Sequence, residues 1–193
     1  PYTTYVRTFS IRGSQVTPVD PTKTDPSKRR QMTISSWSSL ADHVEMTIGT
    51  PPSDQVKNGV IEAIVFEEAM FRGDFRVGDE FNYPISGGLG IPPLKVKVVG
   101  AFKPKDDTDP YWYQGFEPLL NNLIVNENLF RNVLLEQKKI PLNLANWYYA
   151  FDLREIKTSQ LSDLARKLDR LDITLYQKLK DTRVDVSFRD MLS

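Results

Sequence analysis

The segment of residues 94–102 constrains the fold of this chain more than any other segment. Apolar side chains alternate there with two lysines (Leu94, Lys95, Val96, Lys97 and Val98). This period of two is typical of a strand that buries one face. A second apolar segment at 77–83 precedes it, and the loop 84–93 between them holds three glycines and three prolines. Because such a loop reverses the chain, we predict a hairpin of two strands.

The other patterns predict a mixture of strands and helices. Strand-like segments are expected at 2–11, 32–37, 60–65, 123–125, 147–151 and 184–188. Helices are expected near 40–44, with serine as the N-cap, from Glu67, from Asn126 and over 158–179. The intervening stretch 13–30, with its prolines and a basic cluster, is expected to be a solvated loop.

These elements predict an α+β fold with two lobes. Residues 1–115 should form a β-rich lobe, and residues 116–193 a smaller lobe built from β-α-β elements. A leucine stripe on the helix 158–179 should pack against the sheet of its own lobe. We also expect residues 1 and 193 to lie on the same side of the molecule.

Composition excludes several classes of function. Lys and Arg together number 25, as do Asp and Glu, so no net charge directs the chain to nucleic acid. The chain has no cysteine, so disulfides and thiolate metal sites are excluded. No apolar run in the sequence is long enough to cross a bilayer.

The polar candidates for chemistry each have a simpler structural interpretation. His43 is the single histidine and has no evident catalytic partners, so we expect a structural role. The loop 106–117 departs from a calcium loop because Tyr111 stands where a glycine is required. The glycine-rich loop 87–90 lacks the lysine of a phosphate-binding loop. Glu67 and Glu68 suit a helix N-terminus. We therefore expect no catalytic residue, no metal and no cofactor.

One aromatic cluster stands outside the expected strands and helices, and it consists of Tyr111, Trp112, Tyr113 and Phe116. If these side chains are exposed, they form a contact surface for a partner protein, a lipid headgroup zone or a hydrophobic cargo. If they are buried, they form the seam between the two lobes. We favour the buried arrangement, because four exposed aromatic side chains would reduce solubility.

Three stretches together resemble a known family. They read WSSLADHV at 37–44 with GTP at 49–51, IEAIVFEEA at 61–69 with VGDEF at 77–81, and VVGAFKPK at 98–105 with DPYW at 109–112. In their order and spacing they resemble the extracytoplasmic, MacB-type periplasmic core domain of FtsX-like ABC transporter permeases. The resemblance spans about residues 32–188. The stretch 71–76 and the loop 13–30 depart from the family pattern, which leaves the subfamily and its cargo open.

The resemblance implies a non-enzymatic domain of an integral membrane protein, at the extracytoplasmic face of the cell membrane. Its partners would be the membrane helices of its own permease and, through them, a cytoplasmic ABC ATPase. It would engage a cargo or an extracytoplasmic partner protein and couple it to the membrane part by transport or mechanotransmission. The family assigns this domain no catalytic residues. The alternatives are a free-standing extracellular module that binds peptide or glycan, and a hydrolase whose site the sequence does not reveal.

Overall fold

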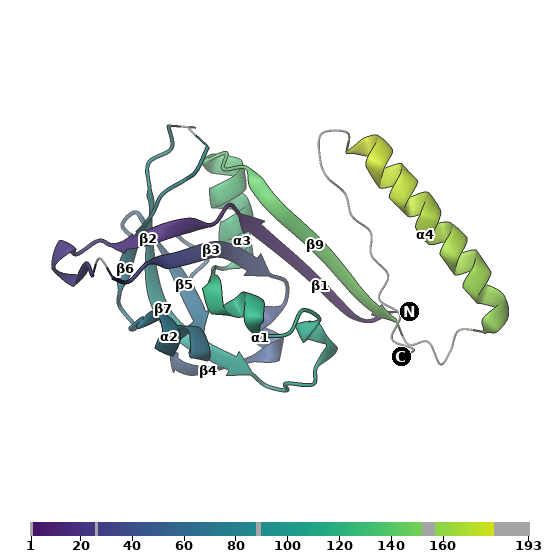
Figure 1. Ribbon diagram of the computed structural model, residues 1–193, viewed down its shortest axis with the longest axis horizontal. Helices are drawn as coiled ribbons and strands as arrows, with labels where there is room; N and C mark the ends of the chain where they lie inside the picture. Colours follow the sequence, from purple (N-terminus) through teal and green to yellow (C-terminus); the bar gives the residue numbers. More distant parts are fainter. Residues whose placement is uncertain (1, 26, 88–89, 152–156, 180–193) are drawn as a thin grey trace. The chain divides into compact units, whose positions relative to one another are not determined.

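The computed structural model describes residues 2–25, 27–87, 90–151 and 157–179 (Figure 1). The strands are β1 (Tyr2–Ile11), β2 (Ser14–Pro18), β3 (Arg30–Trp37), β4 (Val44–Gly49), β5 (Val60–Phe66), β6 (Glu80–Tyr83), β7 (Leu94–Pro104), β8 (Asn122–Ile124) and β9 (Leu142–Phe151). The helical elements are η1 (Pro21–Lys23), α1 (Leu40–His43), α2 (Glu67–Gly73), η2 (Pro110–Trp112), η3 (Glu117–Asn121), α3 (Glu127–Leu129), η4 (Phe130–Gln137) and α4 (Thr158–Lys178). The chain is therefore an α+β protein that is rich in strands, as predicted.

The chain divides into two compact units. One comprises Tyr2–Ala150, and the other comprises Phe151–Ser193 together with Pro1. The lobe boundary expected near residue 116 falls inside the first unit, because β8 pairs there with both β3 and β5. The second unit contains α4, which confirms the helix predicted from the leucine spacing. Leu171 of α4 and Leu179, which follows the helix, are exposed, in contrast to the burial expected for the stripe. The strand expected at 184–188 lies outside the described residues.

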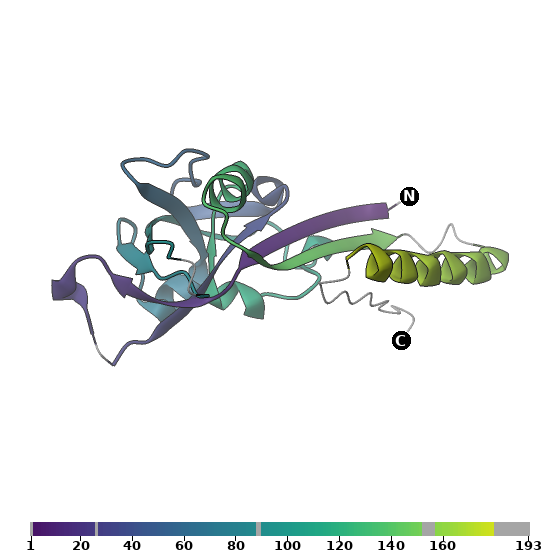
Figure 2. The same ribbon diagram turned by 90° about the horizontal axis from the view of Figure 1, so that it is seen from above.

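The strands of the first unit form one sheet with the order β2-β6-β7-β5-β8-β3-β1-β9. An additional pairing of β2 with β3 closes the strands β2, β6, β7, β5, β8 and β3 into a ring. β4 lies outside this ring and pairs with β7. The pairs β5–β7 and β3–β8 are parallel. The strands β1 and β9 extend from β3 and project from the body of this unit as a two-stranded ribbon (Figures 1 and 2).

The predicted hairpin is confirmed: it consists of β6 and β7, which are neighbours in this ring and pair antiparallel. In β7, Leu94, Val96 and Val98 are buried, as their alternation with the lysines requires. Antiparallel pairing sets Phe81 of β6 opposite Val96. On its other side, β7 pairs in parallel with β5, where Ile61 lies opposite Val96. Since β5 also contributes fully buried aliphatic side chains, β5 and β7 form the centre of the core.

The prediction of a loop over 13–30 was partly wrong. Its first part, Ser14–Pro18, is the strand β2, in which Ser14 and Val16 are buried while Gln15 and Thr17 are exposed. This is the alternation of a half-buried strand, but it is too short to stand out beside the prolines and basic residues that follow. β2 also pairs antiparallel with β3, as expected of a strand.

The helix starts follow the sequence rules with one exception. Glu67 and Glu68 occupy the first turn of α2, where carboxylates favour the helix dipole. Asn126 caps α3 as predicted, because its side chain accepts hydrogen bonds from the backbone N–H groups of Asn128 and Leu129. Ser39 precedes α1 but its side chain makes no capping bond, and its φ is 56°. Among the described helices, none combines the length and the apolar character that a membrane span requires.

Candidate functional site

The predicted aromatic cluster lies in one turn, residues 109–116, which we call the aromatic turn. Asp109 precedes η2, and its carboxylate accepts a hydrogen bond from the backbone N–H of Tyr111 at 2.9 Å. Pro110 occupies the first position of η2, where its fixed φ suits a helical start. These local bonds direct Tyr111 and Trp112 inward, and their exposed fractions are 0% and 6%.

The buried rings connect distant parts of the first unit. Tyr111 stacks on His43 with ring centroids 3.8 Å apart, and its hydroxyl donates to the carbonyl of Ser38 at 2.8 Å. Burial, followed by the nearby charges of Glu127 and Asp109, raises the pKa of Tyr111 well above its usual value. This phenol is therefore a structural donor at ordinary pH.

Trp112 is the second buried ring of the turn. Its ring lies 6.0 Å from that of Trp37 on β3 and 5.6 Å from that of Phe116. Phe116 in turn stacks on Phe66, at the end of β5, at 5.8 Å. Through these contacts the aromatic turn fixes the ends of β3 and β5 to one another.

The aromatic turn also contacts β9. Tyr113 stacks on Tyr148 with centroids 4.3 Å apart and planes 9° from parallel. Tyr113 and Phe116 are half-buried. Of the four residues predicted as a partner contact or a seam, Tyr111 and Trp112 thus have the burial expected of a seam. A contact through Tyr113 and Phe116 stays a prediction.

His43 has a partner that the sequence did not reveal. Its Nδ1 atom lies 2.7 Å from an oxygen of Asp109, and both side chains are 25% exposed. The two residues are 66 positions apart, so no local spacing signals the pair. A histidine held by a carboxylate also occurs in hydrolase sites, but here the ring is stacked on a buried tyrosine. The arrangement holds the aromatic turn against α1.

The other polar candidates lie apart from this turn or serve local structure. Asp106 accepts hydrogen bonds from the backbone and the hydroxyl of Thr108, and these bonds lower its pKa. Glu117 begins η3. Residues 88 and 89 of the glycine-rich loop lie outside the described residues. In the described part of the chain, no group of three or more His, Asp or Glu side chains is placed to hold a metal ion.

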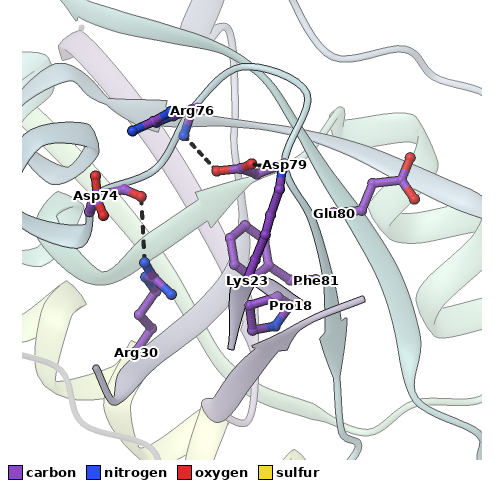
Figure 3. Close-up of a pocket in the computed structure, with 8 residues that line it drawn as sticks. All are labelled: Pro18, Lys23, Arg30, Asp74, Arg76, Asp79, Glu80 and Phe81. Carbon is purple, nitrogen blue, oxygen red and sulfur yellow. Dashed lines mark hydrogen bonds and ion pairs between the residues drawn. The ribbon is translucent and has the colours of Figure 1, made fainter. Parts of the chain in front are cut away.

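A cavity of about 240 Å³ lies beside β2, β6 and the C-terminal end of α2 (Figure 3). Its lining combines charges of both signs with two apolar residues, and consists of Pro18, Lys23, Arg30, Asp74, Arg76, Asp79, Glu80 and Phe81. No pattern in the sequence predicted this cavity, because its charged residues come from three separate segments, at 23, 30 and 74–80.

The charged groups of this cavity bond to one another. Arg30 donates from Nε to the carbonyl of Gly73 at 2.6 Å, and its guanidinium lies over the ring of Phe81. Asp79 pairs with Lys23 at 3.2 Å and accepts from the backbone N–H of Arg76 (Figure 3). These bonds hold the connection between α2 and β6 against η1 and β3, so the charged groups around the cavity have a structural role.

The ribbon of β1 and β9 carries an exposed apolar surface. Trp147 and Tyr149 of β9 are 55% and 45% exposed. Tyr149 lies 4.8 Å from Tyr5 of β1, and Trp147 lies 5.6 Å from Phe9 of β1, measured between ring centroids. The sequence predicted a strand over 147–151 but did not indicate that its rings are exposed. An exposed aromatic surface of this kind is typical of an interaction site.

Comparisons with known proteins give little further information. No protein-family model matches the chain, and no curated protein is similar to it in sequence. Among solved structures, the chain is similar to a domain of a proposed permease protein from Porphyromonas gingivalis. The two are 14% identical, with a TM-score of 0.38, over 94% of this chain and 71% of the other. A TM-score this low does not establish a shared fold.

Proposed function

We propose that this chain is an extracytoplasmic domain of an ABC transporter permease of the FtsX-like, MacB type. The domain is non-enzymatic: it engages a cargo or a partner protein outside the membrane and couples it to the membrane helices of its own permease. A cytoplasmic ABC ATPase drives the movement through those helices. The proposal begins from the three sequence stretches that resemble this family.

The observation that carries the proposal is the arrangement of the first and last strands of the unit Tyr2–Ala150. β1 and β9 lie side by side and run in opposite directions (Figure 1). The chain therefore enters this unit and leaves its last strand at the same end. This arrangement suits a domain that is connected twice to one membrane. Residues 1 and 193 lie outside the described residues, so the expectation that they lie on the same side of the molecule stays a prediction.

The three family-like stretches also meet in one place, which supports their interpretation as one motif. Trp37 of the first stretch lies 6.0 Å from Tyr111 of the third, measured between ring centroids. Phe66 of the second lies 6.0 Å from Phe102 of the third. Residues that are distant in the sequence thus form one aromatic core, so their co-occurrence has a structural reason.

This core also gives a physical route for coupling. Because Tyr113 of the aromatic turn stacks on Tyr148 of β9, the ribbon is fixed to the body of the unit. A displacement of the ribbon would therefore be transmitted to β3 and α1 through packed rings. Mechanotransmission requires a stiff connection of this kind between the membrane and the cargo-binding surface.

The parent protein tests the proposal. It is expressed with its own flanking sequence and an affinity tag, and the membrane fraction is extracted in detergent. We expect the tagged protein in the membrane fraction, together with an ATP-hydrolysing subunit that copurifies with it. Recovery in the soluble fraction without an ATPase would overturn the proposal and favour the free-standing binding module.

A further inference from the structure

We propose that a second cavity of the unit Tyr2–Ala150 binds a carboxylate that carries one apolar group, such as the C-terminus of a peptide that ends in leucine. This cavity has a volume of about 220 Å³ and lies where β1 ends and β9 begins, beside residues 85–87 of the loop after β6. The inference does not depend on the proposed function, because it rests on the residues around this cavity.

The core of the unit fixes the walls of this cavity. Ile11 and Ile140 line it and are only 1% and 4% exposed. The carbonyl of Arg12 accepts a hydrogen bond from the hydroxyl of Tyr83 at 2.7 Å, which fixes the turn after β1. The backbone N–H of Ile140 donates to the carbonyl of Leu134 at 3.0 Å, which fixes the segment that leads into β9. The cavity is therefore formed by the fold itself, as is usual for a ligand site.

Most of the lining is apolar. Ile85, Pro141 and Leu142 line the cavity together with the two buried isoleucines, and Leu142 is 42% exposed. An apolar group in the cavity would remove this surface from water. Pockets for drug-sized ligands have volumes of roughly 300–1,000 Å³. This smaller cavity therefore suits a single side chain of amino-acid size.

The polar part of the lining favours an anion. Arg12 is the only charged residue among the described residues that line the cavity, and its side chain forms no ion pair within the described part of the chain. A guanidinium without a partner can donate two parallel hydrogen bonds to a carboxylate. Ser86 and Asn143 add a hydroxyl and an amide to the lining. Lys138 and Lys139, which are exposed and precede Ile140, add positive charge nearby.

The cavity beside α2 shows the contrast. There Lys23 pairs with Asp79, and Arg30 donates to the carbonyl of Gly73, so the cations are already satisfied within the chain. No acidic residue is found in the described lining of the second cavity. A carboxylate would supply the negative charge that Arg12 lacks, whereas a cationic ligand would be repelled.

Two-dimensional amide NMR spectra of the 193-residue chain test this proposal. The probe is an acetylated peptide of three alanines and a C-terminal leucine. We expect saturable shifts of the amide signals of Ile11, Leu142 and Asn143. The same peptide with an amidated C-terminus should bind at least tenfold more weakly, because it offers Arg12 no charge. A peptide that ends in glycine should also bind more weakly, because it leaves the apolar walls unfilled.

Isocaproate, which has the carbon skeleton of leucine without the amino group, distinguishes the two sources of this chemistry. If it binds at the same residues as tightly as the peptide, the cavity takes a free acid. Tighter binding of the peptide assigns the cavity to a peptide C-terminus. Both results support a site for an apolar carboxylate.

Variants of Arg12 test the assigned contact. Arg12→Gln should weaken binding of the carboxylate peptide at least tenfold and leave binding of the amidated peptide unchanged, while Arg12→Lys should retain most of the affinity. Arg29→Gln is the matched control, because Arg29 is exposed and does not line the cavity. The same spectra show whether each variant is folded. The proposal is overturned if these amide signals show no saturable shift, if the two peptide forms bind equally, or if Arg12→Gln retains full affinity.

Discussion

Nδ1 of His43 lies 2.7 Å from a carboxylate oxygen of Asp109, and this contact joins α1 to the aromatic turn. Asp109 uses its other oxygen to accept the backbone N–H of Tyr111. One carboxylate therefore orients both the histidine and the tyrosine that stacks on it. The position of Tyr111 in the core thus depends on a polar pair at the partly exposed end of the turn.

We predict that the His43–Asp109 pair is energetically coupled. Replacing either residue (His43→Ala or Asp109→Asn) should destabilise the protein, and the double variant should lose less than the sum of the two. A coupling free energy of about 0.5–1.5 kcal/mol is expected for two polar groups in contact. Urea unfolding of the four proteins at pH 7 measures it. Strict additivity would show that the contact contributes nothing.

Trp112 should contribute to stability through burial of its ring. Trp112→Ala is expected to lower the free energy of unfolding by about 3–5 kcal/mol, because it leaves a cavity between β3 and β5. Trp112→Phe should cost clearly less, since Nε1 of Trp112 has no hydrogen-bond partner among the described residues. Phe71→Ala, at an exposed position, should change stability by less than about 0.5 kcal/mol. Equal effects of Trp112→Ala and Phe71→Ala would contradict this account.

Tyr83 should make the fold sensitive to alkaline pH. Its buried hydroxyl donates to the carbonyl of Arg12 at 2.7 Å, and burial raises its pKa from 10.0 to about 12. The unfolded chain loses this proton near pH 10 while the folded chain keeps it. The stabilising contribution is therefore complete below pH 10 and is lost as the pH rises to about 12.

The variant Tyr83→Phe isolates this effect. It should be less stable than the wild type at pH 8, because the bond to Arg12 is lost. Its stability should then fall less steeply between pH 10 and pH 12, by up to about 2–3 kcal/mol relative to the wild type. Urea unfolding across this range gives both slopes. Identical slopes would show that Tyr83 does not titrate differently in the two states.

Gly100 should not tolerate a side chain. A Cβ atom there would lie 2.8 Å from the carbonyl oxygens of Ile48 and Thr50, because β4 crosses close to β7 at this position. Gly100→Ala should cost about 2–3 kcal/mol through this overlap. At Gly59 the surrounding space is open and only the φ of 76° opposes alanine, so Gly59→Ala should cost about 1 kcal/mol. If thermal melts show the reverse order, the close approach at Gly100 is incorrect.

Local patterns predicted β7 and α4. The alternation at 94–102 reflects one buried face of a strand, the spacing of leucines over 158–179 reflects the period of a helix, and both can be recognised in a short window. β2 was missed because its alternation is short and flanked by prolines. The capping expected from Ser39 failed because its backbone is left-handed, which no pattern in the sequence indicates.

Contacts between segments that are distant in the sequence could not be predicted from local patterns. The pairing of β2 with β3 and β6, which closes the ring of strands, depends on contacts that no short window contains. The His43–Asp109 pair and the cavity beside α2 depend in the same way on residues from separate segments. The exposure of Trp147 was also unpredictable, because an apolar strand at the edge of a sheet resembles a buried strand in sequence.

Accessibility labelling in intact cells tests the central claim, that this domain lies outside the membrane. The chain has no cysteine, so Gln55→Cys gives this domain one reactive site on an exposed loop, and any cysteine elsewhere in the parent protein is first replaced by serine. Ala63→Cys, at a fully buried position, reports non-specific labelling. We predict that a membrane-impermeant maleimide labels Gln55→Cys in intact cells and leaves Ala63→Cys unlabelled. Labelling of Gln55→Cys only after the cells are permeabilised would contradict the account.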